Sequence, residues 1–214
     1  MPPNFALPSA QASRGNAAPI RAAACCILVL AFALPFRSLA ATPPSGCPAP
    51  AEQNTTSRGG HEHDFDWEIG NWKVRLKRLL HPLTGSNTWV EFEGTANVRK
   101  VWEGRANLLE LELNGPAGHI EGLSLRTYNP QSGEWSIYFA TSDDGLLATP
   151  MVGHFQNGRG EFSDREPFHG KTIDVHFVFS NVTAESFHGE QSFSADDGRT
   201  WERNWIEDFT RTKP

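Results

Sequence analysis

Alternation of apolar and polar side chains over residues 72–77 constrains the fold of this chain more than any other feature. Trp72, Val74 and Leu76 fall on one side of the pattern, and basic residues fall on the other. Successive side chains of a β-strand leave opposite faces of the sheet, so this period of two predicts a half-buried strand. Gly70, just before it, permits a sharp turn of the backbone. A tryptophan-rich turn that leads into such a strand is expected at the start of a small antiparallel barrel.

Short apolar or alternating runs recur along the chain, each bounded by turn residues. The predicted strands span 71–80, 88–98, 105–113, 119–128, 134–141, 151–156, 159–164, 171–180, 186–194 and 200–210. No helix of convincing length interrupts them, which indicates a β-sandwich or a closed barrel. Sequential hairpins favour closure, because a closed barrel leaves no exposed strand edge. We therefore predict an all-β, antiparallel, up-and-down barrel of about 8–10 strands.

The first forty residues have the pattern of a secretory signal peptide. Arg14 and Arg21 precede an apolar run, and Ser38-Leu39-Ala40 places small residues at the spacing that signal peptidase recognises. A membrane span needs about 20 apolar residues. This run is shorter and contains Pro35. The sequence therefore predicts cleavage after Ala40, export to the periplasm or the medium, and no transmembrane span in the mature chain.

The predicted domain organisation follows from this cleavage. Residues 1–40 form the signal peptide, and residues 41–60 are rich in Pro, Ala, Ser, Thr and Gly, which is typical of a flexible linker. Residues 61–214 then form one β-barrel domain. Two of the three cysteines lie in the leader, so Cys47 is left without an intramolecular disulfide partner. The leader also carries three Arg and no acid, so the mature chain is more acidic than the formal net charge of −6. An acidic surface argues against nucleic-acid binding.

Five segments of the chain resemble an uncharacterised family of secreted bacterial proteins, a DUF1579-like domain of unknown function. They are His63–Val74, Trp89–Gly94, Gly122–Arg126, Trp135–Tyr138 and Phe193–Trp205. The resemblance covers nearly the whole mature domain, about residues 61–211. It implies a calycin-like (lipocalin-like) barrel and, as is frequent in the family, a secretion signal. It implies no activity, because the family brings no catalytic residues that could be assigned to positions of this sequence.

Histidine patterns were considered as metal or haem sites. His61-Glu62-His63-Asp64 offers half of a metal site, but no second motif supplies the remaining ligands. Calycin-like barrels include haem-binding nitrobindins, and a proximal histidine would have to face an apolar interior. His176 and His188 alternate against the aromatic side of their strands, while His119 and His154 lie at strand ends. The sequence therefore predicts neither a metal nor another cofactor.

The remaining motifs that could indicate an enzyme are better explained by structural roles. The Ser194–Trp201 segment matches the Asp-box hairpin, in which the Ser and Asp cap a turn. Glu91/Glu93 and Glu110/Glu112 lie two apart on single strands, whereas glycoside hydrolysis needs two carboxylates that face each other. The mature chain has no nucleophile elbow, phosphate loop or dinucleotide fingerprint. These observations disfavour the commonest enzyme classes.

The predicted function is non-covalent binding of a small, partly apolar or amphipathic molecule in the barrel mouth. Tryptophans are expected to form the wall, and polar residues within apolar strands are expected to orient the ligand. The predicted ligand-binding residues are Trp72, Trp89, Arg126, Trp135, Tyr138, Glu190, Asn204 and Trp205. Gly122 and Ser124 share a face with Arg126 and leave it room, and Glu190 is its expected ion-pair partner.

Two alternatives to ligand binding stay open from the sequence. The first is a cofactor-free enzyme, such as an isomerase, cyclase or hydratase, that uses Glu190 or Tyr138 as acid or base. The second is a structural envelope protein whose barrel is filled by its own side chains. A measured cavity would argue against the second, and an inward carboxyl group with a raised pKa would favour the first. The oligomeric state is not predicted.

Overall fold

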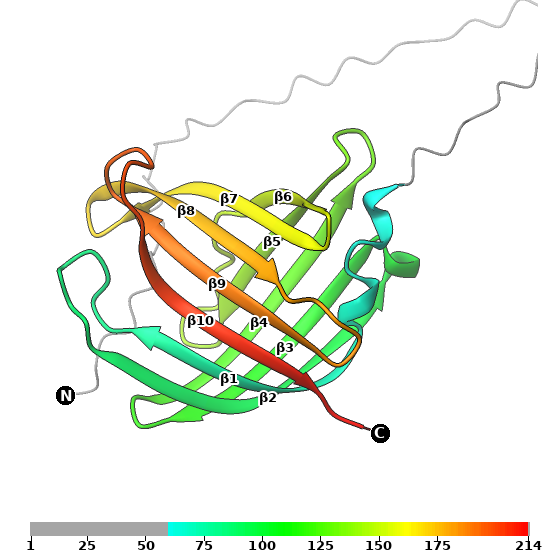
Figure 1. The fold of residues 1–214 in the computed structure, drawn as a ribbon, viewed down its shortest axis with the longest axis horizontal. Helices are drawn as coiled ribbons and strands as arrows, with labels where there is room; N and C mark the ends of the chain where they lie inside the picture. The colour runs from blue at the N-terminus through cyan, green and yellow to red at the C-terminus, as the bar shows by residue number, and fades with distance from the viewer. Residues whose placement is uncertain (1–59, 214) are drawn as a thin grey trace, which may run out of the picture. The chain divides into compact units, whose positions relative to one another are not determined.

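Ten strands follow one another around a closed antiparallel barrel in the computed structural model, which describes residues 60–213 (Figure 1). The strands are β1 (Gly70–Leu79), β2 (Trp89–Val101), β3 (Ala106–Gly115), β4 (Gly118–Asn129), β5 (Glu134–Thr141), β6 (Met151–Gln156), β7 (Arg159–Phe168), β8 (Lys171–Ser180), β9 (Ser186–Ser194) and β10 (Glu202–Arg211). Each strand pairs with its neighbours in the sequence, and β1 pairs with β10 to close the barrel. The predicted all-β, up-and-down barrel is confirmed.

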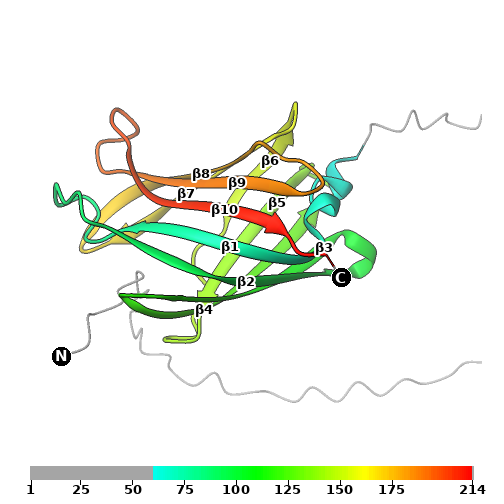
Figure 2. The ribbon, with the colours of Figure 1, turned by 60° about the horizontal axis from the view of Figure 1, so that its bottom comes forward.

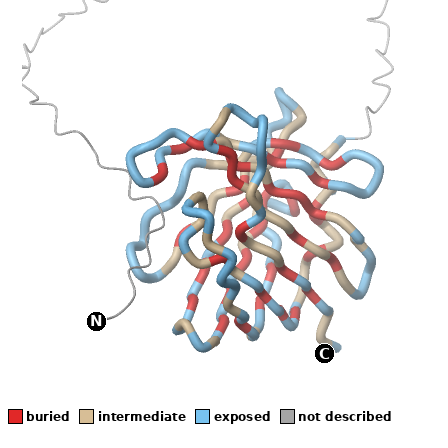
Figure 3. Tube along the Cα trace, turned by 60° about the vertical axis from the view of Figure 1, so that its left-hand side comes forward, coloured by how far each residue is buried: buried red, intermediate tan, exposed pale blue. Residues whose placement is uncertain are grey.

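The alternation seen in the sequence becomes the division between core and surface. In β1, the side chains of Trp72, Val74 and Leu76 are buried, while the basic residues between them are exposed. Figure 3 shows the same exchange of buried and exposed positions along the other strands. Most of the buried positions are apolar and form a core of aromatic and aliphatic side chains inside the barrel. Burial of this apolar surface is the main force that favours the closed sheet.

Strand β7 extends past its predicted end at residue 164 and reaches Phe168. The extra segment, Arg165-Glu166-Pro167-Phe168, has no apolar alternation. In the structure Asp164, Glu166 and Phe168 line the barrel interior, and the first two carry carboxyl groups. Because inward residues at this position are polar, hydrophobic periodicity did not predict this part of the strand.

Three short 3-10 helices accompany the strands: η1 (His61–His63), η2 (Asp66–Glu68) and η3 (Trp102–Gly104). The segment of η1 and η2 lies at one end of the barrel (Figures 1 and 2). Phe65 is 1% exposed, and its ring packs edge-on against Trp135 and Phe155 at centroid distances of 5.0 Å. The segment therefore closes this end with an aromatic plug.

Side chains of the barrel wall hold the plug by its backbone carbonyl groups. The indole of Trp72 donates a hydrogen bond to the carbonyl of Glu68, and that of Trp135 donates to the carbonyl of His61, both at 2.7 Å. Arg211 donates to the carbonyls of residues 67 and 69. The segment at 61–64 is thus part of the folded domain.

The turn between β9 and β10 confirms the structural interpretation of the Asp-box motif. The hydroxyl of Ser194 accepts a hydrogen bond from the backbone of Gly198 at 2.9 Å and donates to Asp196 at 2.9 Å. Asp196 also accepts hydrogen bonds from the hydroxyl and backbone of Thr200, which lower its pKa to about 2. These side chains shape the turn, and Trp201 is 45% exposed beside it.

The predicted signal peptide and nearly all of the predicted linker lie outside the described residues. Within residues 60–213, no helix has the length and apolar character needed to cross a membrane.

Candidate functional site

A cavity of about 800 Å³ lies inside the barrel. The plug covers the end at which β1 begins, and the cavity reaches the opposite end, near the loops after β1, β5 and β7. Its wall is mostly aromatic and aliphatic. The main apolar lining residues are Phe92, Leu109, Leu111, Ile137, Phe139, Phe177, Phe179, Phe193, Trp205 and Phe209. The space has the size and apolar character of a small-molecule site.

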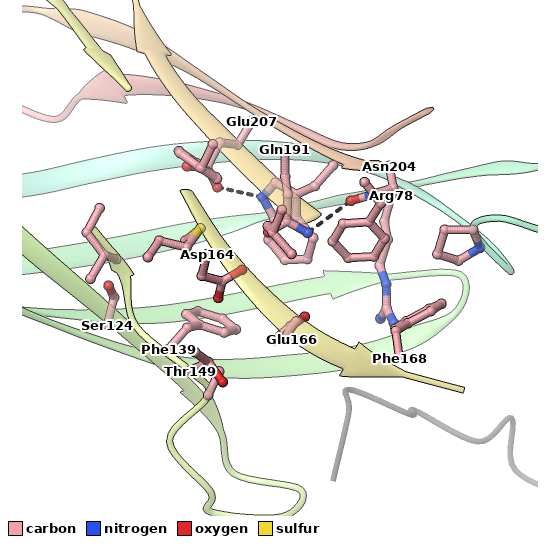
Figure 4. A pocket seen from close by; sticks show the side chains of 18 of the residues that line it. Arg78, Ser124, Phe139, Thr149, Asp164, Glu166, Phe168, Gln191, Asn204 and Glu207 are labelled. Atoms are coloured by element: carbon pink, nitrogen blue, oxygen red, sulfur yellow. Dashed lines mark hydrogen bonds between the residues drawn. The ribbon is translucent and has the colours of Figure 1, made fainter. Parts of the chain in front are cut away.

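Polar side chains enter this apolar space from several strands (Figure 4). Those from β4 and β7 are Ser124, Arg126, Asp164 and Glu166, and those from β9 and β10 are Gln191, Asn204 and Glu207. Arg78, His81 and His169 lie at the open end. A few polar groups inside an apolar cavity are the usual means of orienting a ligand.

Arg126 lies between the cavity and the plug, where it forms a buried ion pair with Glu68. Its Nη1 is 2.5 Å from Oε2 of Glu68, and the two side chains are 5% and 0% exposed. The same nitrogen donates to Asn107 Oδ1 at 3.3 Å, and the guanidinium carbon lies 5.1 Å from the centre of the Phe65 ring. Burial raises the pKa of Glu68, and the charge of Arg126 opposes that rise. Arg126 is therefore an internal anchor of the plug.

Asn204 and Trp205 both line the cavity although they are consecutive in the sequence. A shift in the pairing of β10 with β9 between Arg203 and Trp205 allows this. A bulge of this kind re-aims a side chain that would otherwise face outwards. The Asn204 Oδ1 accepts a hydrogen bond from Gln191 at 3.0 Å, and its buried Nδ2 has no hydrogen-bond partner among residues 60–213.

Glu207 places a carboxyl group on the cavity wall next to Trp205. The indole nitrogen of Trp205 donates to Glu207 Oε2 at 2.7 Å. Gly189 on the adjacent strand makes room for it, because a Cβ there would lie 2.7 Å from both Cγ and Oε1 of Glu207. Burial is the largest cause of a pKa raised to about 7 for this carboxyl group, and the hydrogen bond from Trp205 opposes the rise.

Asp164 and Glu166 lie two residues apart on β7 and face the same space. The buried Oδ1 of Asp164 has no hydrogen-bond partner within the described chain. Burial, with the nearby charge of Glu166 as a second cause, raises the pKa of Asp164 to about 7. Glu166 is 8% exposed, and burial raises its pKa as well.

Three of the eight predicted site residues line the cavity: Arg126, Asn204 and Trp205. Arg126 does share its inward face with Gly122 and Ser124, as predicted. The room beside Gly122 is taken by Phe139, whose ring would lie 2.9 Å from an added Cβ.

The placement of the other five in the cavity wall is wrong. Trp72 and Trp135 are fully buried but hold the plug, and Trp89 is 37% exposed outside the cavity lining. Tyr138 falls between two inward residues of β5 and so faces outwards. Glu190 bonds to His188 and Arg203 on the outer face. The expected Arg126–Glu190 pair is therefore also wrong, because β9 turns Glu190 away from the interior.

The acidic groups of the cavity were missed by the sequence analysis. Glu68 precedes the first strand, in the segment that was expected to be a tryptophan-rich turn. Asp164 was the last residue of a predicted strand, and Glu166 fell beyond that strand's predicted end. Glu207 alone left a usable signal, since it alternates with Trp205 and Phe209 along an apolar strand face.

Neither a family model nor a curated protein sequence matches this chain. Solved structures do resemble it. The S-type phycobiliprotein lyase CPES from Guillardia theta is 10% identical, with a TM-score of 0.51 over 73% of this chain and 95% of that one. Rv2717c from M. tuberculosis is also 10% identical, with a TM-score of 0.50 over 72% of this chain and 98% of that one. At such low identity the likeness shows the fold alone, a calycin-like barrel.

We predict that Arg126→Leu destabilises the protein by about 3–5 kcal/mol, because it leaves the Glu68 carboxyl group buried without its partner. The double variant Arg126→Leu/Glu68→Leu should recover most of this loss, since no buried charge then remains. Arg75→Leu is the control, because its pair with Glu93 is on the surface and such pairs contribute less than about 1 kcal/mol. Urea unfolding of all three measures the effect. Equal stability of the Arg126 and Arg75 variants would contradict it.

We predict that Glu207→Gln changes how stability depends on pH. The folded chain keeps the Glu207 proton to about pH 7, whereas the unfolded chain releases it near the ordinary value of 4.5. The wild-type protein therefore loses stability as the pH rises between these values, by roughly 3 kcal/mol from this group. Urea unfolding across that range should show a smaller loss for Glu207→Gln. Glu110→Gln is the control, because Glu110 lies on the exposed face of β3, and its stability should depend on pH as that of the wild type does. If the stability of Glu207→Gln showed the same pH dependence as the wild type, the raised pKa of Glu207 would be refuted.

Proposed function

We propose that this barrel binds a small, partly apolar molecule non-covalently in its internal cavity. The observation that carries the proposal is the cavity of about 800 Å³ with a mainly apolar wall. Ligand sites typically occupy about 300–1,000 Å³ and contain a few well-placed polar groups. A structural protein whose side chains filled the barrel would not retain such a space. The buried Nδ2 of Asn204 and Oδ1 of Asp164 have no hydrogen-bond partner within residues 60–213. They support the proposal further, because a bound molecule can satisfy them.

A cofactor-free enzyme is the second candidate, and Glu207 favours it. A general acid or base works best when its pKa is near the operating pH, and Glu207 has a pKa of about 7 on the cavity wall. Asp164 has a similar pKa in the same cavity. Glu207 or Asp164 would then be the acid or base that the sequence analysis expected in Glu190 or Tyr138, because Glu190 and Tyr138 face outwards. Buried carboxyl groups also occur in binding sites without catalysis, so binding remains the first proposal.

The sequence pattern supports two further parts of the proposal. Residues 1–40 would act as a cleaved signal peptide and residues 41–60 as a linker, so that the barrel works in the periplasm or outside the cell. The five segments that resemble the DUF1579-like family would make this chain one of its members. Both statements rest on residue patterns.

Ligand binding is tested by native mass spectrometry of the protein purified from the periplasm of an expression host. We expect an additional mass on the folded protein that disappears under denaturing conditions. Ser124→Phe, which places a ring inside the cavity, should reduce its occupancy several-fold. Ser163→Phe, on the exposed face of β7, should retain it. Equal occupancy in both variants would place the molecule outside the cavity, and a ligand that is converted, on incubation with wild type but not with Glu207→Gln, to a product that chromatography separates from it would favour the enzyme.

Export is tested by N-terminal sequencing of the protein recovered from the periplasm. The expected mature chain begins near Ala41. Deletion of residues 22–36 should keep the protein in the cytoplasm, with the remaining leader residues uncleaved. A periplasmic protein that still begins at Met1, or export of the deletion variant, would contradict the signal-peptide prediction.

A further inference from the structure

We propose that the cavity selects organic cations, meaning molecules that carry an ammonium or amidinium group on an apolar skeleton. This inference rests on the proposed ligand-binding function and names its ligand class. Three carboxyl-bearing side chains in the cavity wall are its starting point: Asp164 and Glu166 from β7, and Glu207 from β10 (Figure 4). Together they present negative charge or hydrogen-bond acceptors to one enclosed space.

Within residues 60–213, no basic nitrogen of Lys, Arg or His lies within ion-pair distance of these three carboxyl groups. The pairs that do form are on the outer face, in the plug, or between Arg126 and Glu68. The positive charge of Arg126 is already balanced by Glu68, at 2.5 Å. Arg78 lies at the open end, where Asp143 is near it. The interior carboxyl groups therefore have no ion-pair partner within the described chain.

One of these carboxyl groups also lacks a hydrogen-bond donor. Asp164 Oδ1 is buried without a partner in the described chain, and Glu166, two residues away on the same strand, is 8% exposed. A buried acceptor without a donor costs free energy, because it has lost its hydrogen bonds to water. A cationic nitrogen supplies both the hydrogen-bond donor and the ion-pair partner, since its N–H groups donate and its charge pairs with a carboxylate. An anionic ligand would supply neither.

The aromatic wall favours the same sign of charge. Phe139, Phe168, Phe177, Phe193 and Trp205 line the space that the carboxyl groups enter. The face of an aromatic ring carries a negative partial charge and attracts ammonium or guanidinium groups within about 6 Å. The apolar skeleton of a ligand would contact the same rings. The aromatic wall and the carboxyl groups thus both favour an organic cation with an apolar skeleton.

Binding of a cation should also release protons. The raised pKa values of Asp164 and Glu207 mean that the empty cavity holds part of its acid in the protonated form near pH 7. The charged groups that act on them are Glu166 for Asp164, and Arg126, Glu68 and His188 for Glu207. A cation beside these groups lowers their pKa and drives the proton into the buffer.

The test uses three probes with one skeleton: 1-naphthylmethylamine, 1-naphthalenemethanol and 1-naphthaleneacetic acid. Isothermal titration calorimetry of the exported protein at pH 7 measures each. We expect the amine to bind at least about tenfold more tightly than the alcohol, and the acid to bind most weakly. In buffers of different ionisation enthalpy, the amine alone should show proton release.

Matched variants locate the selectivity. Asp164→Asn and Glu166→Gln, measured separately so that failure of one to fold leaves the other, should reduce the affinity of the amine towards that of the alcohol. Affinity for the alcohol should change less than twofold. Glu161→Gln is the control, because it lies on the same strand but on its exposed face. An amine preference that survives in both folded cavity variants would overturn the proposal.

The two proposals fail in different ways. If the alcohol or the acid binds at least as tightly as the amine, and Ser124→Phe abolishes that binding, the cavity binds ligands but does not select cations. If none of the probes binds at millimolar concentration, the cavity is not a site for such molecules and the proposed function fails with this inference.

Discussion

The buried ion pair between Arg126 and Glu68 joins the barrel wall to the segment that closes one end of the barrel. Removing two charges from water is costly, and the pair regains that cost only where geometry and hydrogen bonds are good. Here Glu68 Oε1 and Arg126 Nε have no partner within residues 60–213, so the compensation is incomplete. The aromatic rings around the pair and the hydrogen bonds that Trp72, Trp135 and Arg211 donate to the plug backbone must therefore supply the rest. The ion pair marks where the core ends and the cavity begins.

Beyond this boundary the same barrel serves two purposes. At the plugged end, aromatic rings such as Phe65, Phe155 and Phe179 fill the interior by edge-to-face contacts, which contribute beyond their buried area. At the other end, the strands continue but the side chains stop filling the space, and carboxyl and amide groups take the place of apolar residues. Closure of the sheet does not need a filled interior at both ends. One packed end can hold the barrel while the open end carries a site.

Hydrophobic periodicity predicted nearly all of the strands, because most inward positions are apolar. It also placed Arg126 inside, since small neighbours on its face implied room. It failed where an inward position is polar, because the part of β7 that contains Glu166, beyond residue 164, was not predicted as strand. It also could not separate two uses of a buried tryptophan, because Trp72 and Trp135 bind the plug while Trp205 lines the cavity. Glu68 could not be found as the partner of Arg126, since their contact crosses 58 positions of the chain and depends on a fold of the plug that no local pattern encodes.

The cavity lowers the free energy of unfolding, and a bound ligand would raise it again. The cavity is lined by carboxyl groups with raised pKa values and by the amide of Asn204, whose Nδ2 has no partner in the part of the chain that the structure describes. Such a cavity without a ligand is less stable than a packed core of the same size. With no possible internal disulfide in the predicted mature chain, only packing offsets this cost. A molecule that binds the folded state but not the unfolded state adds stability in proportion to the logarithm of its concentration over its dissociation constant. The groups that weaken the empty barrel are thus the ones through which a ligand would stabilise it.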